Sequence, residues 1–237
     1  FMTRILLIIS IAVMLFSDSI VFAKDKLPIP TTWNNDLKEL IFGDEVIEDG
    51  SNILSLDTPY RALDAAIVPI SLNFKKKQTD NEYVKFITLI VDENPSPLVS
   101  KFKLSPKVGD PSLTTRIRVD KYTYVRAVFE MNNGKKYMTA NYVKAAGGCS
   151  APSLADMDAV MARLGKMKMK FIETGSDARS INKAEFLISH PNYSGLQFNQ
   201  LTRSEIPAHF INYLKIEQDG QLILEAFPDI SLSEDPS

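Results

Sequence analysis

The only cysteine of the chain, Cys149, is the side chain best suited to covalent chemistry, and it lies in the stretch AAGGCSAP, residues 145–152. A single thiol cannot close an intramolecular disulfide, so it is buried, joined to another molecule, or used in chemistry. Gly147 and Gly148 bring no side chains for packing, and Pro152 indicates a loop or the approach to a helix. This local sequence favours an exposed, reactive thiol over a buried cysteine that acts as a small apolar residue.

The remaining side chains give this thiol little catalytic support. One cysteine and two histidines are too few for an ordinary zinc site, and no Cys-x-x-Cys pair is present for dithiol redox chemistry. A cysteine hydrolase or a one-cysteine peroxidase would need a base beside Cys149, and His190 and His209 both lie in a later β-region. No phosphate-binding loop, dinucleotide fingerprint or GxSxG motif occurs. We therefore expect no metal and no cofactor, and a thiol without its own base suits a passive carrier that other proteins load and unload.

The segments before the cysteine have the patterns of β-strands. They are residues 61–74, 82–91, 114–119 and the hairpin 122–145, which turns at Asn132-Asn133-Gly134. In the third of these, Arg116 and Arg118 alternate with apolar residues, which predicts a half-buried strand with a solvated face. Residues 33–44 have the pattern of a short helix. Cys149 is thus expected directly after a strand, where the chain leaves an antiparallel sandwich.

A short helix and a second β-region are predicted after the cysteine. Ser153 and Asp156 have the spacing of a capping box, and Gly165 is placed to end the helix. Strand patterns follow at residues 166–173 and 185–191, and a hairpin at 213–228 turns at Asp219-Gly220. No strand pattern follows that hairpin, so the second region is expected to be incomplete and to leave an unpaired sheet edge.

The N-terminal residues have the pattern of a secretory signal. Arg4 precedes an apolar run over residues 5–16, and Ala23 stands where a signal peptidase would cleave. Polar residues 17–19 interrupt the run before it reaches the roughly 20 residues of a membrane span, which leaves an uncleaved anchor as the less favoured alternative. The formal net charge of −2 provides no basic field for nucleic acid. We expect an exported, periplasmic protein with no nucleic-acid partner and no membrane contact after signal removal.

Eight stretches carry a family resemblance that extends over nearly all of the chain from about Trp33 onward. They are PYRALDAAIVPISLNF, DENPSPLVSKFKL, TTRIRV, the 122–145 hairpin and GGCSAP, followed by LISHPNYSGL, IPAHFINYLKI and GQLILEAFPDI. Together they resemble the fused SoxYZ-like sulfur carriers, specifically the quinoprotein dehydrogenase-associated type. The most specific pieces are the GGC element and the stretch from ISHP to IP.

The resemblance implies a fold and a division into domains. The first half is similar to SoxY and the second to SoxZ, each an immunoglobulin-like β-sandwich. The expected fold is therefore all-β, with two immunoglobulin-like β-sandwich domains joined by a short helical linker and a truncated C-terminal domain. The expected parts are a signal peptide at 1–23, a SoxY-like sandwich at 24–146, a cysteine-bearing linker with a short helix at 147–165, and an incomplete SoxZ-like sandwich at 166–237.

The resemblance also implies a function, which is not enzymatic. In SoxY, a cysteine in a GGCGG arm covalently carries sulfur intermediates of thiosulfate oxidation to periplasmic enzymes. Cys149 matches that cysteine as the site of cargo attachment, and Gly147 and Gly148 match the glycines that make the arm flexible. The implied partners are periplasmic sulfur-oxidation proteins, or quinoprotein dehydrogenase and cytochrome c components.

Two departures from the family pattern bear on that function. Residues 150–152 replace the glycines that follow the family cysteine, and the chain continues, so this arm is tethered at both ends. The association with quinoprotein dehydrogenases leaves a second function open. In that alternative, the protein is an accessory module that binds such a dehydrogenase or its cytochrome without covalent chemistry.

Overall fold

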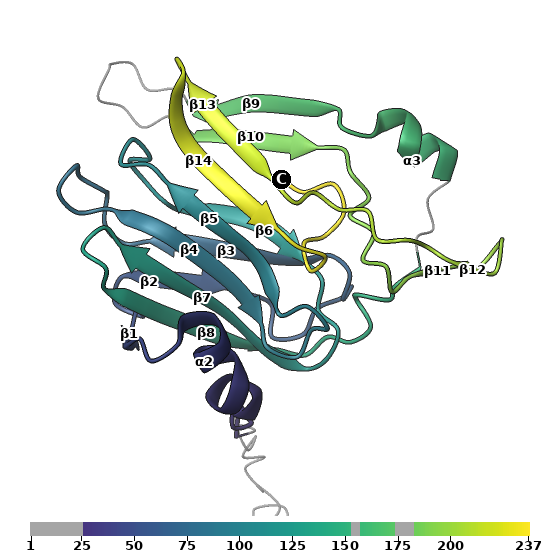
Figure 1. Ribbon diagram of the computed structural model, residues 1–237, viewed down its shortest axis with the longest axis horizontal. Helices are drawn as coiled ribbons and strands as arrows, with labels where there is room; N and C mark the ends of the chain where they lie inside the picture. The colour runs from purple at the N-terminus through teal and green to yellow at the C-terminus, as the bar shows by residue number, and fades with distance from the viewer. Residues whose placement is uncertain (1–25, 153–156, 174–182) are drawn as a thin grey trace, which may run out of the picture.

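The computed structural model describes residues 26–152, 157–173 and 183–237, and these residues form a mostly β protein (Figure 1). The predicted signal peptide and both residues of the predicted capping box, Ser153 and Asp156, lie outside the described residues. Within the described part, no helix is long and apolar enough to cross a membrane.

The first β-region is a sandwich of two sheets that face each other. The larger sheet contains β1 (Ile47–Asp49), β4 (Val84–Val91), β5 (Leu98–Leu104), β7 (Thr123–Met131) and β8 (Lys136–Val143). The smaller sheet contains β2 (Leu54–Asp57), β3 (Val68–Phe74) and β6 (Leu113–Ile117), in the order β2-β3-β6. The predicted hairpin is confirmed, since β7 and β8 pair antiparallel on either side of the expected turn.

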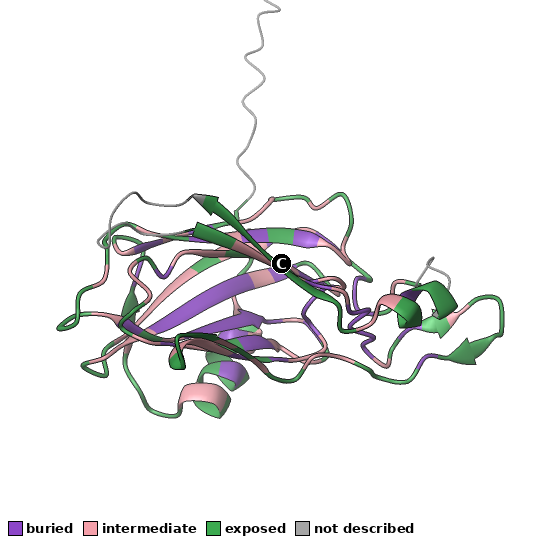
Figure 2. Cartoon of the chain, turned by 90° about the horizontal axis from the view of Figure 1, so that it is seen from above, coloured by how far each residue is buried: buried purple, intermediate pink, exposed green. Residues whose placement is uncertain are grey.

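The hydrophobic core lies between these two sheets, as the burial colours show (Figure 2). Val68, Ile70 and Leu72 of β3 are buried at alternate positions, as expected for a strand that turns one face to the interior. Phe129 of β7 stacks on Tyr137, with 5.4 Å between ring centroids. The alternation of apolar and polar residues that predicted the strands therefore also determines which side chains lie in the core.

The second β-region consists of three hairpins. Strand β9 (Met167–Glu173) pairs with β10 (Lys183–Ile188), β11 (Phe198–Asn199) with β12 (Ser204–Glu205), and β13 (Leu214–Gln218) with β14 (Gln221–Pro228). The last hairpin joins the large sheet, because β14 pairs antiparallel with β5 from Leu224↔Leu104 to Pro228↔Ser100 (Figure 1). The large sheet thus has seven strands in the order β1-β8-β7-β4-β5-β14-β13, with β13 at its edge. The all-β sandwich class is confirmed, and one continuous sheet connects the two β-regions.

The chain after β14 returns to the end of the first sandwich. Leu232 joins the hydrophobic core, and Ser231 and Ser233 are fully buried. The Arg118 N–H donates to the Ser231 carbonyl at 2.9 Å, and the Ser233 N–H donates to the Arg116 carbonyl at 3.1 Å. This return places C-terminal residues beside the segment that follows β6.

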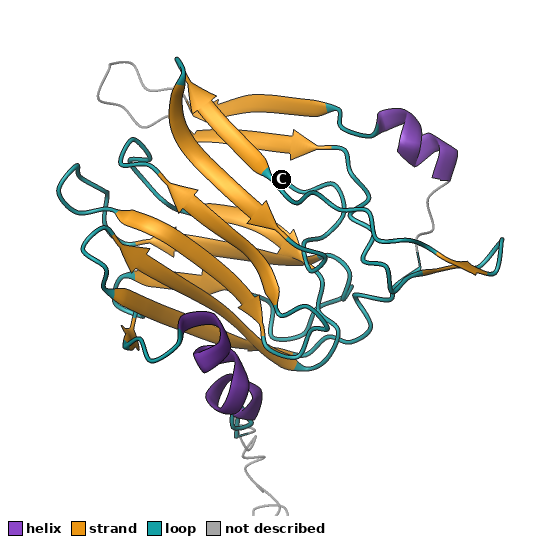
Figure 3. Ribbon diagram, viewed as in Figure 1, coloured by secondary structure: helices purple, strands orange, loops and turns teal. Residues whose placement is uncertain are grey.

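Helices are few among the described residues (Figure 3). The predicted helix at 33–44 is observed as a π-helical turn, η1 (Trp33–Leu37), that continues into α2 (Lys38–Phe42). It is held to the large sheet because the Arg126 guanidinium lies 4.5 Å from the Trp33 ring centroid. Arg126 also forms a buried ion pair with Asp92 at 2.7 Å. The helix after the cysteine, α3 (Met157–Arg163), ends before Gly165, whose φ is +74°.

Candidate functional site

Cys149 lies in a loop of residues 145–152, here called the cysteine loop, that follows β8 and is packed against the end of the first sandwich. The cysteine is 0% exposed. The expectation of an exposed thiol is therefore wrong for this conformation. The physical reason lies in the adjacent glycine: a Cβ added to Gly148 would stand 2.0 Å from the Ala65 carbonyl oxygen. Here the absence of a side chain permits close backbone packing, which brings the thiol inside the protein.

Backbone hydrogen bonds tie this loop to the connection between β6 and β7. The Gly147 N–H donates to the Asp120 carbonyl at 2.8 Å, and the Gly148 N–H donates to the Val119 carbonyl at 2.9 Å. Gly147 has a φ of +81°, which other residues adopt only with strain. In this conformation both glycines are held in place, so a flexible arm would require these contacts to open.

Side chains from the second β-region hold the other side of the cysteine loop. The Ser194 hydroxyl donates to the Cys149 carbonyl, and the Gln197 side-chain amide donates to the Ala151 carbonyl at 2.9 Å. The Ser194 N–H in turn donates to the Gln197 side-chain oxygen at 3.1 Å. Ser194 and Gln197 are both buried. Neither residue could be identified from the sequence, since polar side chains in a loop are ordinarily solvated.

Arg118 joins the two β-regions and the cysteine loop through its guanidinium. One terminal nitrogen donates to the Gly148 carbonyl at 3.2 Å, and the other donates to the carbonyls of Pro191 and Asn192 at 3.4 and 3.3 Å. Arg118 is only 2% exposed, so the solvated face predicted for this segment is wrong at this position. The reason is that residues 191–192 and the returning C-terminal segment cover it.

The electrostatic environment keeps the thiol protonated. Burial, followed by the nearby Asp120 carboxylate, raises the pKa of Cys149 to about 12, although Arg118 and a hydrogen bond with Ser231 act in the opposite direction. At neutral pH almost no thiolate forms in this conformation, and the thiolate is the nucleophilic form of cysteine. The site as it stands protects the thiol from reaction.

The two histidines do not supply the base that a cysteine enzyme would need. Their rings contact each other, with 4.9 Å between centroids, and the His190 Nδ1 accepts a hydrogen bond from the Asn192 N–H at 3.0 Å. Neither histidine is among the groups that shift the pKa of Cys149. Among the described residues, no group of three or more metal-ligating side chains is present either.

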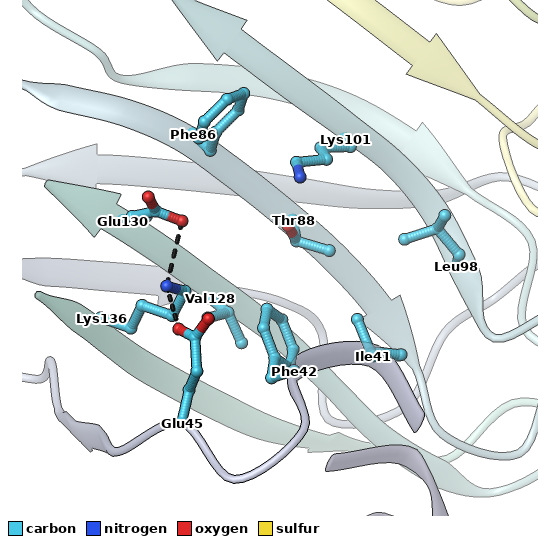
Figure 4. Close-up of a pocket in the computed structure, with 10 residues that line it drawn as sticks. All are labelled: Ile41, Phe42, Glu45, Phe86, Thr88, Leu98, Lys101, Val128, Glu130 and Lys136. Atoms are coloured by element: carbon cyan, nitrogen blue, oxygen red, sulfur yellow. Dashed lines mark ion pairs between the residues drawn. The ribbon is translucent and has the colours of Figure 1, made fainter. Parts of the chain in front are cut away.

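Two concave regions lie away from the cysteine loop. One, of about 300 Å³, lies between α2 and the outer face of the large sheet, where Lys136 forms ion pairs with both Glu45 and Glu130 (Figure 4). The other, of about 360 Å³, lies between the β9–β10 hairpin and the sandwich and is largely apolar. Cys149 lines neither cavity. The candidate site is therefore the cysteine loop, and neither of these cavities is part of it.

The family comparisons divide the chain at this loop. The family model described as "Sulfur oxidation protein SoxY" matches residues 38–149, and the model described as "Sulphur oxidation protein SoxZ" matches residues 169–237. The first match ends at Cys149. No curated protein matches the chain.

Several solved structures are similar to parts of this chain. The sulfur carrier protein SoxY from Chlorobium limicola f thiosulfatophilum has 23% identity and a TM-score of 0.40, over 49% of this chain and 94% of that one. A superoxide reductase (neelaredoxin) from Ignicoccus hospitalis has 12% identity and a TM-score of 0.36, over 41% and 86%. A putative superoxide reductase from Thermotoga maritima has 14% identity and a TM-score of 0.36, over 43% and 94%. The two family matches together cover most of the chain, which therefore consists of a SoxY-family domain followed by a SoxZ-family domain in one polypeptide.

Proposed function

We propose that this protein is a covalent sulfur carrier and that Cys149 is the site where the cargo is attached. The observation that carries the proposal is that the SoxY match ends on the only cysteine, directly after Gly147 and Gly148. The cysteine loop also lies where the two halves of the molecule meet, because groups from both halves hydrogen bond to it. A carrier needs no base of its own, which agrees with the absence of histidine among the groups that shift the thiol pKa.

Sulfur exchange would load the thiol without an external oxidant. The Cys149 thiolate attacks a terminal sulfur of a polysulfide or of a persulfide donor, and a new S–S bond forms while the S–S bond of the donor breaks. The electron pair of the broken bond leaves on the shortened donor, and the thiol proton goes to solvent. The product is a persulfide on Cys149. Unloading is the same exchange in reverse, with a nucleophile of the acceptor taking the outer sulfur.

Loading requires that the cysteine loop opens, since the thiol is buried and its pKa is about 12. Opening breaks the hydrogen bonds made by Ser194, Gln197 and the Arg118 guanidinium, together with the two backbone bonds of the glycines. Each such bond contributes about 0.5–1.5 kcal/mol. Gly147 and Gly148 then supply the backbone freedom that an opened loop needs. We infer that the described conformation is the closed, protected state of the carrier.

The proposed setting is the periplasm, after removal of a signal peptide at residues 1–23. The partners would be sulfur-oxidation proteins, and more specifically components of a quinoprotein dehydrogenase and cytochrome c system. We propose residues 24–146 as the SoxY-like part, 147–165 as the linker and 166–237 as the SoxZ-like part. The linker is joined to folded protein on both sides, so it extends less far than a free tail would. A partner must therefore approach the surface of the protein more closely to reach Cys149.

The test is sulfur loading of the purified protein. After incubation with polysulfide, intact-mass spectrometry should detect the mass of one added sulfur atom, and treatment with cyanide should remove that atom as thiocyanate. The Cys149→Ser variant is the matched control and should gain no sulfur. If the wild-type protein gains no sulfur even after prolonged incubation, the carrier proposal fails.

The burial of Cys149 also favours a second candidate function, in which the thiol is incidental and the protein is an accessory module. In that case it binds a periplasmic quinoprotein dehydrogenase or its cytochrome without covalent chemistry. This candidate predicts stable co-purification with such a partner, undiminished in Cys149→Ser. A partner complex that depends on the thiol would exclude it.

A further inference from the structure

We propose that the buried guanidinium of Arg118 is the counter-charge for an anionic sulfur adduct on Cys149, so that the closed site selects a persulfide or a thiosulfonate over neutral adducts. This inference rests on the proposed carrier function. It names the residue that stabilises the anionic form of that cargo in the closed site.

Arg118 has no counter-charge among the described residues. Its hydrogen bonds all go to backbone carbonyls, those of Gly148, Pro191 and Asn192. Within the described residues it forms no ion pair, and its Nε is buried without any hydrogen-bond partner. A buried cation held only by neutral groups is costly, and unpartnered buried donors in proteins commonly mark a missing anion or water.

A second buried arginine in the same domain provides a contrast. Arg126 forms a bidentate pair with Asp92, with contacts of 2.8 and 2.7 Å between its nitrogens and the carboxylate oxygens. The fold therefore neutralises one fully buried arginine with a carboxylate of its own and leaves the other unpaired. The unpaired one is the arginine beside the thiol.

The guanidinium of Arg118 lies beside the cysteine loop. Arg118 donates to the carbonyl of Gly148, which is the residue directly before Cys149, and it is one of the groups that lower the pKa of the thiol. Arg118 therefore attracts a negative charge at this sulfur. A persulfide and a thiosulfonate both place a negative charge on the atoms beyond the cysteine sulfur, whereas a methyl disulfide carries none.

The other charged and polar groups around the thiol do not replace Arg118. Asp120 repels a negative charge at the sulfur, and Ser231 contributes a hydrogen bond. Glu234 and Asp64 act on Arg118 over a distance, and neither forms an ion pair with it. Arg118 is thus the single cation among the groups that shift the pKa of the thiol, and the stability of an anionic adduct in the closed site depends on it.

The experiment compares a charged with an uncharged adduct in the full-length protein. Polysulfide adds one sulfur atom to Cys149 as a persulfide anion. Methyl methanethiosulfonate adds a neutral methyl disulfide, with methanesulfinate as the leaving group. The lifetime of each adduct in the presence of a small phosphine reductant is followed by intact mass. Arg118→Gln removes the charge, Arg118→Lys keeps it, and Arg116→Gln is the matched control, because Arg116 donates to the Asp235 carbonyl instead.

We expect Arg118→Gln to shorten the lifetime of the persulfide roughly 10- to 100-fold, the size of one lost hydrogen bond to a charged group. The methyl disulfide should change much less, Arg118→Lys should restore part of the persulfide lifetime, and Arg116→Gln should leave it unchanged. Equal losses for both adducts would mean that Arg118 only holds the loop shut, and the inference would be overturned. A wild-type protein that takes up no sulfur at all would instead overturn the carrier function.

A measurement on the wild-type protein keeps the inference testable if Arg118→Gln does not fold. The midpoint of thermal unfolding is compared for the free thiol, the persulfide and the methyl disulfide. We expect the persulfide to have a higher midpoint than the methyl disulfide, because only the persulfide pairs with the buried cation. A midpoint for the persulfide that is equal to or lower than that of the methyl disulfide would contradict the inference.

Discussion

The hydrogen bonds of Ser194 and Gln197 to the cysteine loop predict that the thiol becomes reactive when they are removed. Both side chains come from the second β-region and donate to carbonyls of the loop, at Cys149 and Ala151. In Ser194→Ala and Gln197→Ala the closed state loses these bonds, while the opened loop makes neither. Each substitution should therefore increase the fraction of molecules with an exposed thiol.

The magnitude follows from the pKa and from the hydrogen bonds. A thiol pKa of about 12 in place of the ordinary 9.0 lowers the thiolate fraction at neutral pH about a thousandfold. Wild-type protein should thus react at least that much more slowly than a free cysteine, unless it opens. One hydrogen bond of about 1 kcal/mol corresponds to an increase of about fivefold in the opened fraction for each variant. The double variant should gain less than the product, since Ser194 and Gln197 also bond to each other.

The assay is the rate of alkylation of Cys149 by iodoacetamide near pH 7.5, followed by intact mass. Ser204→Ala is the matched control, because the hydroxyl of this exposed serine bonds to the neighbouring Thr202 hydroxyl and not to the cysteine loop. Its rate should equal that of the wild type. The reasoning would be refuted by a wild-type rate equal to that of a free cysteine in a short peptide. It would equally be refuted if both loop variants reacted at the wild-type rate.

Three further predictions concern packing and charge. Gly148→Ala should lower the thermal midpoint and speed alkylation of the thiol, because the added Cβ meets a backbone carbonyl at 2.0 Å; an unchanged midpoint would contradict the close packing. Asp92→Asn should cost about 3–5 kcal/mol in the free energy of urea unfolding, because it leaves Arg126 buried without its partner; a loss below about 1 kcal/mol would argue against the ion pair. Burial, together with the charge of neighbouring His209, lowers the pKa of His190 below its ordinary 6.5. Its contribution to stability should be complete above that value and be lost as the pH falls through the lowered pKa, because the unfolded chain binds the proton first. Urea midpoints between about pH 7.5 and about pH 5 should show this fall, and it should be smaller in His190→Asn.

Local sequence signals predicted the strands and turns well. The hairpin at 122–145 is observed as β7 and β8, and the Asp219-Gly220 turn joins β13 to β14, because alternation and turn residues act over short distances. The attachment of β14 to β5 could not be predicted in this way. It joins residues more than 100 positions apart, and nothing in either strand specifies its partner.

The sequence predicted Cys149 as a candidate site, but it did not predict the surroundings of the thiol. Cys149 was identified from its type and its neighbours, yet a glycine before it is compatible both with mobility and with close packing. Which of these holds depends on the carbonyls of Ala65 and Val119, which only the fold brings near. Arg118 was missed for the same reason, because its alternation with apolar residues indicated solvent and distant segments cover it.

The most direct test of the central claim is the intact mass of this protein purified from its native host without reductant. A carrier predicts a fraction of molecules with a sulfur-containing adduct that disappears on reduction and is absent from Cys149→Ser. If the protein is always unmodified, and Cys149→Ser leaves growth on reduced sulfur compounds and on quinoprotein dehydrogenase substrates unchanged, then Cys149 does not carry cargo.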